Sequence, residues 1–493
     1  MPKITHQQAR RAGVLLHISS LPSGDFGDDA FRFVDFLAET GASVWQTLPL
    51  NMPHDDGSPY QCLSAHAGNP VFISLASLLS DHLLTKHDLI QHDITQSGAN
   101  RKELLALAYS RYKEIKNTKL KKEFTLFCQE NIAWLGDFAL FLVLREKFKH
   151  ISWNTWPLAY KNKQPVLIKK LKLRYSHEIA VIKFTQFIFF KQWLALKAHA
   201  NKKGVAMFGD IPIFVAFDSA DVWSQPHAFK LDANKNTEVV AGVPPDYFSV
   251  TGQRWGNPHY NWQAMQANGF KWWLGRIRTQ QCMFDLLRID HFRGLQAAWE
   301  IPASEETAIN GAWVEAPGDA LLSAIVKRFP NMHLVAEDLG IITDEVDALR
   351  EKYNLPGMKI LQFAFGGDAD NPYLPENIDE NSVVYTGTHD NDTTLGWYQT
   401  LDIGAKAHLH TLLENEAPNM PQALVELALS TKANLAIIPM QDILGLDGAH
   451  RMNIPGTMGG NWQWRFDWDA FENLDKTSIK NAIKSSGRAN KWV

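Results

Sequence analysis

Short apolar runs that alternate with helical spacing constrain the fold of this chain more than any other feature. Such a run, rich in β-branched residues and ended by a polar or small residue, is typical of a buried strand. The runs occupy residues 14–18, 43–50, 205–216, 283–290, 333–338, 358–365, 382–388 and 435–443. Eight strands separated by helices predict an α/β fold of the (β/α)8 barrel type.

Helical patterns lie between several of these runs. Apolar residues recur at helical spacing over residues 28–40, 318–329, 342–353 and 420–432. The third pattern opens on Thr343-Asp344-Glu345, with acids where a helix N-terminus favours them. A doubly wound sheet would instead want a glycine-rich phosphate-binding turn, but neither GxGxxG nor GxxxxGK[ST] occurs. The barrel is therefore the preferred fold.

Two stretches between predicted strands are too long for ordinary loops. Residues 55–204 carry amphipathic patterns at 101–116, 120–149 and 178–202, which predict a largely helical insertion. Residues 217–282 are dense in glycine and proline and predict a loop-rich wall. Both leave the carboxyl ends of strands, where barrel enzymes hold their substrates. We therefore expect a single catalytic domain over residues 1–493 whose two insertions wall the cleft.

Composition narrows the class of protein. The 493 residues are 45% hydrophobic with a net charge of −4, and scattered Lys and Arg residues give no nucleic-acid footprint. The three cysteines, Cys62, Cys128 and Cys282, show no CxxC spacing, which argues against a disulfide framework or a thiolate zinc site. Neither the residue order of a signal peptide nor an apolar stretch of about 20 residues occurs. These features predict a soluble cytoplasmic protein with a small or uncharged partner and no membrane contact.

Three acidic residues each follow one of the apolar runs. Asp290 stands in Arg-Ile-Asp-His-Phe-Arg-Gly, Glu337 in Ala-Glu-Asp-Leu-Gly and Asp390 in Thr-His-Asp-Asn-Asp. A buried carboxylate is unfavourable unless it is paired, so strand ends that repeatedly deliver one beside Arg or His indicate a shared polar cleft. In a barrel these acids follow the fourth, fifth and seventh strands and lie on one rim. We predict the active site there.

Two converging carboxyl groups are what retaining glycosyl transfer requires. One attacks the anomeric carbon, while the other, kept protonated by a raised pKa, donates to the leaving oxygen. A third acid can bind sugar hydroxyls and favour a distorted ring. Arg288 lies two positions before Asp290 on the same strand face, so we expect it to keep Asp290 ionised and to lower its pKa. His389, next to Asp390, offers a neutral donor to sugar hydroxyls.

Other interpretations of these residues stay open at this point. A single Asp at a strand end is more often a helix or turn cap than a catalyst, although three on one rim favour chemistry. His389 and Asp390 could also join His291 or Asp392 in a metal site, but no HExxH or other ligand spacing accompanies them. A serine nucleophile is not favoured because no GxSxG occurs.

Taken in order, the motifs resemble those of the 4-alpha-glucanotransferases of the amylomaltase and disproportionating-enzyme type, glycoside hydrolase family 77, in the α-amylase clan. The resemblance covers nearly the whole chain. It rests on Gly13-Val14-Leu15-Leu16-His17, Trp45-Gln46, Leu48-Pro49-Leu50, Ser58-Pro59-Tyr60-Gln61, Gly209-Asp210-Ile211-Pro212, the 242–260 loop, the three acidic motifs, Leu355-Pro356-Gly357-Met358-Lys359 and residues 451–457.

The resemblance implies a barrel without a C-terminal β-sandwich and without a metal or organic cofactor. It implies transfer of a segment from a maltooligosaccharide or α-1,4-glucan donor to the 4-hydroxyl of glucose or another glucan, through a covalent β-glucosyl intermediate. Asp290 would be the nucleophile, Glu337 the general acid/base and Asp390 the transition-state stabiliser. The implied glucan contacts are Arg288, His389, Asp210, Tyr60, Ser58, Gln253, Trp255, Asp338 and Asn461.

The 242–260 loop, with Tyr247, Phe248 and Trp255, is the expected lid that holds the acceptor and excludes water. Two rival functions remain: a glucan hydrolase of the same clan, and a non-catalytic glucan-binding protein. The chain departs from the family pattern over residues 51–57 and at Ala298 and Glu376, which leaves the preferred glucan length open.

Overall fold

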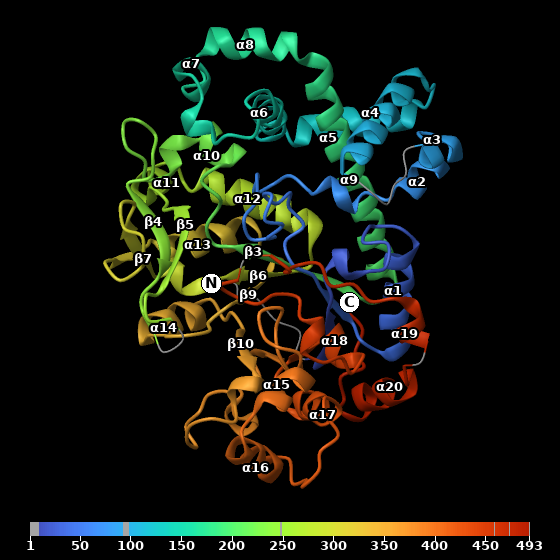
Figure 1. Ribbon diagram of the computed structural model, residues 1–493, viewed down its shortest axis with the longest axis vertical. Coiled ribbons are helices and arrows are strands. Elements are labelled where there is room, and N and C mark those ends of the chain that lie inside the picture. The colour runs from blue at the N-terminus through green and yellow to red at the C-terminus, as the bar shows by residue number, and fades with distance from the viewer. Residues whose placement is uncertain (1–8, 92–97, 247–248, 458, 473, 493) are drawn as a thin grey trace.

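Eight parallel strands form a nearly closed barrel at the centre of the protein (Figure 1). The structure is a computed structural model that describes residues 9–91, 98–246, 249–457, 459–472 and 474–492. The barrel strands pair in the order β10-β11-β12-β1-β2-β3-β6-β9. They are β1 (Arg11–Leu15), β2 (Val44–Gln46), β3 (Ala206–Pro212), β6 (Leu286–Asp290), β9 (His333–Ala336), β10 (Gly357–Ile360), β11 (Ser382–Tyr385) and β12 (Leu435–Pro439). Each predicted run contains or overlaps one of them, which confirms the predicted fold class.

The barrel closes between β9 and β10. The backbone N–H of Ala336 donates to the carbonyl oxygen of Pro356, just before β10, at 2.9 Å. The first strand begins three residues earlier than predicted. Arg11 and Gly13, which a sequence pattern treats as interruptions, pair with β12 in the parallel ladder.

Alternation along the strands places charge at one end of the barrel interior. Ala206 and Phe208 of β3 and Leu286 of β6 belong to an apolar cluster inside the barrel, whereas their neighbours Met207 and Leu287 pack outward against the helices. Side chains two apart share a face of a strand. The next inward positions on β3 and β6 therefore carry polar side chains, so the interior changes from apolar to charged toward the carboxyl ends.

Four helices lie where their patterns predict them: α1 (Asp28–Thr40), α13 (Gly318–Arg328), α14 (Asp344–Lys352) and α17 (Gln422–Ser430). The C-terminal half of the described chain adds α15 (Thr394–Thr400), α16 (Ile403–Leu412), α18 (Met440–Ile443), α19 (Trp468–Glu472) and α20 (Lys476–Ser485). In Figure 1 the helices α15, α16 and α17 cover the lower side of the barrel.

The segment between β2 and β3 is mostly helical and lies above the barrel in Figure 1. Its helices are α2 (Leu75–Ser80), α3 (Lys86–Gln91), α4 (Gly98–Glu114), α5 (Thr118–Glu130), α6 (Leu135–Lys147), α7 (Leu158–Lys161), α8 (Pro165–Arg174) and α9 (Ser176–Lys202). The pattern over residues 120–149 is two helices, α5 and α6, that meet at 91°. Asn131 breaks it, because its side chain accepts a hydrogen bond from Trp134 Nε1 at 2.9 Å and donates to the Phe127 carbonyl.

Helix α9 is long and apolar enough, by length and composition, to cross a membrane. Of its most apolar 18-residue window, 61% is buried inside the protein. Its Phe189 and Trp193 are fully buried and contact Phe26 at ring-centroid distances of 5.2 and 5.3 Å. This burial is typical of a core helix.

A second sheet, which the sequence pattern did not predict, forms part of the 217–282 segment and the chain after β6. Its antiparallel strands pair in the order β5-β4-β7-β8. They are β4 (Val239–Val243), β5 (Gln253–Pro258), β7 (Ala297–Pro302) and β8 (Ala312–Glu315), and the segment also holds α10 (Ala220–Ser224), α11 (Trp262–Ala267) and α12 (Lys271–Met283). The loop-rich wall predicted for residues 217–282 thus also contains strands β4 and β5, where glycine weakens the strand pattern. Gly242 is needed for the pairing, since a Cβ there would lie 2.1 Å from the Gln253 carbonyl oxygen.

Candidate active site

An ion-pair cluster closes the barrel interior at the carboxyl ends of β3 and β6. Arg288 stands beside Asp210 in the parallel register and two residues before Asp290. Its Nη1 lies 2.6 Å from Asp210 Oδ2 and its Nη2 lies 2.8 Å from Asp290 Oδ1. The Arg288 side chain is only 5% exposed. One buried guanidinium therefore binds two carboxylates, and Arg288 faces Asp290 as the spacing predicts.

Tyr60, from the segment after β2, joins this cluster to His389. Its hydroxyl lies 2.8 Å from Asp210 Oδ2 and 2.8 Å from His389 Nε2, and its ring stacks on the imidazole with centroids 5.3 Å apart. The Asp210 carboxylate can only accept, so Tyr60 donates to it and accepts from His389 Nε2–H. Burial raises the pKa of Tyr60 well above its usual value and lowers the pKa of His389. His389 is thus a neutral imidazole with its proton on Nε2.

Glu337 follows β9 and is held by backbone donors. The N–H of His291 donates to Glu337 Oε2 at 2.6 Å, and the N–H of Leu339 donates to Oε1 at 2.9 Å. Because His291 directly follows Asp290, this hydrogen bond also places Glu337 beside the end of β6. Glu337 and Asp290 therefore lie on one rim, as the strand positions predict.

The pKa of Asp290 differs from the expectation. Burial raises it, the Arg288 guanidinium lowers it, and the charges of Glu337, Asp210 and Asp390 raise it further, so the pKa lies above its ordinary value. The predicted lowering is wrong, because one cation does not outweigh burial among several carboxylates. Burial raises the pKa of Glu337 as well, against Arg288 and the two backbone donors. Each of the two carboxyl groups therefore holds its proton to a higher pH than an isolated acid does.

Asp390 is the most open of the three acids, with 48% of its side chain exposed. Its Oδ1 accepts from Asn453 Nδ2 at 2.6 Å, and its Oδ2 lies 3.4 Å from His389 Nε2. Arg451 Nη2 donates to the Asp390 carbonyl at 3.0 Å. Sequence reasoning missed Asn453 and Arg451 as site residues, although both lie in the 451–457 motif and could have been found there.

Several predicted glucan contacts form hydrogen bonds near the cluster. Trp255 on β5 donates to Gln253 Oε1 at 3.2 Å and meets the His291 ring edge-on. The Ser58 hydroxyl accepts from the Tyr60 backbone N–H at 3.4 Å. Tyr247 and Phe248, expected in the lid, lie outside the described residues.

Asp338 and Asn461 have mainly local partners. Asp338 is buried, accepts from the Met358 N–H at 2.7 Å and lies 3.4 Å from Arg350 Nε, so it tethers the start of β10. Asn461 accepts from the Ile454 N–H at 3.0 Å and donates to Thr457, which shapes its own loop.

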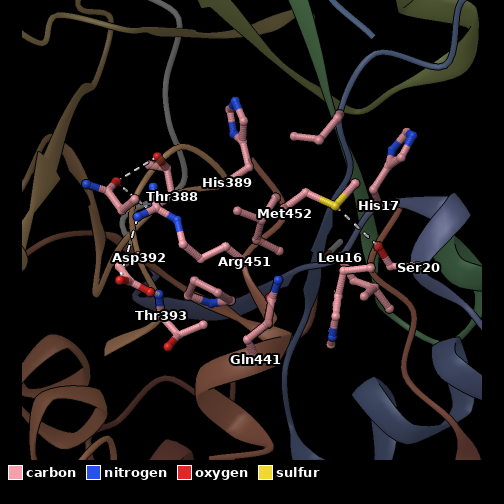
Figure 2. Close-up of a pocket in the computed structure, with 15 residues that line it drawn as sticks. Leu16, His17, Ser20, Thr388, His389, Asp392, Thr393, Gln441, Arg451 and Met452 are labelled. Carbon is pink, nitrogen blue, oxygen red and sulfur yellow. Dashed lines mark hydrogen bonds and ion pairs between the residues drawn. The ribbon is translucent and has the colours of Figure 1, made fainter. Parts of the chain in front are cut away.

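A pocket lies beside the cluster, at the carboxyl ends of β1, β11 and β12 (Figure 2). His389 lines this pocket, while Asp290, Glu337 and Asp390 do not, so the pocket lies beside the acids and not between them. In Figure 2 the Arg451 guanidinium points toward Asp392, with Nη1 3.6 Å from Oδ2. Asp392 and Arg451 also line this pocket. The other lining residues of the pocket are Leu15, Leu16, His17, Ser20, Leu48, Thr388, Asn391, Thr393, Pro439, Gln441, Met452 and Trp464.

The described residues contain no cluster of side chains that could bind a metal ion. Within them, no group of three or more His, Cys, Asp or Glu side chains could hold a metal ion.

Comparison with known proteins identifies the family. A sequence profile described as 4-alpha-glucanotransferase, that of glycoside hydrolase family 77, matches residues 16–470. This chain belongs to the 4-alpha-glucanotransferase family. It is 45% identical over 478 residues to the 4-alpha-glucanotransferase of Synechocystis sp., covering 93% of this chain and 94% of that one. It is 41% identical to the chloroplastic/amyloplastic enzyme of Solanum tuberosum, covering 99% and 88% of the two chains.

Solved structures agree with this family. The amylomaltase from Streptococcus agalactiae in complex with acarbose superimposes with a TM-score of 0.93 and 36% identity, covering 98% of this chain and 100% of that one. The amylomaltase from Corynebacterium glutamicum, at 19% identity and a TM-score of 0.76, shows the same fold over 98% of this chain and 75% of that one. The protein is thus a glycosyltransferase that acts on α-1,4-glucans.

Proposed function

We propose that this glucanotransferase transfers a segment of an α-1,4-glucan to the 4-hydroxyl of glucose or of another α-1,4-glucan by a retaining double displacement. The observation that carries the proposal is the pairing of Asp290 and Glu337. They end adjacent barrel strands beside one buried cation, Arg288, and both have raised pKa values. A pair that keeps one proton supplies a nucleophile and an acid together.

In the first step, Asp290 attacks the anomeric carbon and the glycosidic C1–O bond breaks. Glu337 gives its proton to the leaving 4-oxygen, which departs as the hydroxyl of the reducing-side fragment. Glu337 becomes a carboxylate in this step, and the N–H groups of His291 and Leu339 stabilise that charge. The product is a β-glucosyl ester on Asp290.

In the second step, the 4-hydroxyl of the acceptor gives its proton to Glu337 and attacks the anomeric carbon, so Asp290 is released. Transfer succeeds only if the acceptor is held and water is excluded. Asp390 and the neutral His389 bind sugar hydroxyls and stabilise the transition state. Gln253 and Trp255 of β5, the strand that contacts His291 through Trp255, hold the acceptor.

The remaining proposed residues have two roles. In this proposal, Ser58 and Asn461 hold the donor. Arg288, Asp210 and Tyr60 set the position and the charge of Asp290. Asp338, which is buried against Arg350, shapes the wall at β10. The free cysteines Cys62, Cys128 and Cys282 are consistent with a cytoplasmic enzyme.

The experiment is to incubate the pure protein with maltotriose, separate the products by chromatography and assay total reducing ends in parallel. Disproportionation predicts longer and shorter maltooligosaccharides with glucose released and reducing ends constant. Rising reducing ends without longer products would make the protein a hydrolase. If the maltotriose remains unchanged, the proposal fails and a binding role gains support. The matched control is Asp290→Asn, which should lose at least about 10⁴-fold in rate.

A further inference from the structure

His291 adopts a backbone conformation that residues other than glycine rarely adopt. Its φ of 56° and ψ of 50° lie in the left-handed region, although neither Gly nor Asn occupies the position. Such a conformation persists only where the surroundings impose it, and it concentrates at functional sites. Here the turn directly follows Asp290 and opens the short 3-10 helix at Phe292–Leu295.

The turn at His291 is tied to Glu337 at three points. The His291 N–H donates to Glu337 Oε2 at 2.6 Å, and the Phe292 N–H donates to the Glu337 carbonyl at 3.0 Å. The Glu337 N–H in turn donates to the Ile289 carbonyl at 3.1 Å. Only the first bond reaches the carboxyl group, and its direction depends on the path of the chain through His291.

The His291 ring is neutral and packs against an aromatic side chain of β5. Its Nε2 is buried and has no hydrogen-bond partner within the described chain. Burial, Arg293 and His259 lower the pKa of this imidazole to about 3, so it is neutral. The ring meets Trp255 of β5 edge-on, with centroids 4.8 Å apart at 89°. A Cβ on Gly294 would lie 3.0 Å from His291 Cδ2, so the glycine leaves room for the ring.

We infer that His291 is a positioning residue that aims a backbone N–H at the Glu337 carboxyl and braces that turn on Trp255. One residue thereby connects the group that moves the proton to the strand proposed to hold the acceptor. The inference rests on the proposed role of Glu337 as the acid/base.

The pKa of Glu337 depends on the charged groups around it and on the hydrogen bond from the His291 N–H. Arg288 and Asp290 face it from β6, Asp338 follows it in sequence, and Tyr373 interacts with it from the segment after β10. A donor to the carboxylate favours the ionised form. Loss of the His291 N–H bond therefore raises the pKa of Glu337 and moves the alkaline limb of the pH profile upward.

The test compares His291→Val with His291→Asn, because both remove the imidazole but only Asn adopts the left-handed region readily. We expect kcat/KM for maltotriose to fall about 10-fold further in His291→Val than in His291→Asn, as a misplaced acid/base predicts. The alkaline limb of kcat/KM should move up by about half a pH unit in the Val variant and stay in place in the Asn variant. If His291→Val and His291→Asn have the same kcat/KM and the same alkaline limb in the pH profile, the inference is overturned.

Two further variants keep the test decisive. His291→Gly adopts the turn without strain, so it should match His291→Asn even if the Val variant fails to fold; a limb shifted in Gly would contradict the inference. Glu337→Gln separates the two levels of argument. If Glu337→Gln keeps the activity, the proposed function fails. If it loses the activity while Val and Asn behave alike, only the inference about His291 fails.

Discussion

Two buried arginines at opposite ends of the barrel have opposite surroundings. Arg288, at the carboxyl end, contacts the carboxylates of Asp210 and Asp290. Arg488, close to the end of the described chain, is 0% exposed and donates to the carbonyls of Leu429 at 2.7 Å, Arg11 at 3.0 Å and Thr431 at 2.9 Å. Within the described residues no carboxylate lies at ion-pair distance from Arg488.

The pKa values of Arg288 and Arg488 differ because their partners differ. Burial lowers the pKa of Arg288, but Asp210 and Asp290 outweigh it and the pKa lies well above its usual value. Burial and Arg10 lower the pKa of Arg488 to about 9. The buried cation at the carboxyl end is paired with carboxylates and supports the charge that the proposed mechanism needs there. The one at the other end is paired with carbonyls and joins Arg11 to residues 429–431.

The largest effect on activity should follow Arg288→Met. Removing the cation takes away the charge that lowers the pKa of Asp290, so this pKa rises further, less of Asp290 is ionised and it attacks poorly. We expect kcat/KM for maltotriose to fall at least about 10³-fold, since removal of one preorganised charge at a reacting centre costs on that order. A fall of less than tenfold would show that Arg288 does not set the charge of Asp290.

Arg488→Met makes the same substitution at the opposite end of the barrel from Arg288→Met. It should lower the free energy of unfolding by about 3 kcal/mol, because several buried carbonyls lose a donor. Denaturant unfolding measures this loss. The kcat/KM at 25 °C should stay within about threefold of the unchanged protein, because Arg488 is far from the transition state. A catalytic loss like that of Arg288→Met would show that Arg488 also acts on the active site.

Tyr60→Phe tests the neutral part of the carboxyl-end network. The ring stack on His389 can remain, but Asp210 loses one donor and His389 Nε2–H loses its acceptor. We expect kcat/KM to fall about 10-fold, the effect of one hydrogen bond to a charged group. Initial rates on maltotriose give the answer, and an unchanged rate would remove Tyr60 from the network.

Asn453→Ala should have the smallest effect. It removes the donor to Asp390 Oδ1, but Asp390 is half exposed and water can take the place of the amide. We expect kcat/KM to fall about threefold to fivefold, below the effect of a buried hydrogen bond. An effect larger than that of Tyr60→Phe would mean that Asn453 binds glucan directly.

Local patterns predicted the barrel because strand and helix periods are properties of short segments. The alternation that puts Phe208 inside also puts Asp210 inside, so the polar rim could be placed from the spacing alone. The second sheet was missed because glycines interrupt β4 and β5 and because β8 is mostly exposed and gives no buried apolar run. The contact of Asn453 with Asp390 spans 63 residues, and the hydrogen bond from the His291 N–H to Glu337 spans 46. The raised pKa of Asp290 likewise depends on burial among side chains distant in sequence.

Trapping the covalent ester on Asp290 tests the proposed double displacement. Glu337→Gln is incubated with α-maltotriosyl fluoride, whose leaving group needs no proton, and is then quenched in acid, digested and analysed by mass spectrometry. We predict that one maltotriosyl group is attached to the peptide that contains Asp290, and that none is attached in the variant that also carries Asp290→Asn. Fluoride release without an adduct, or an adduct on a different residue, would contradict the double displacement through Asp290.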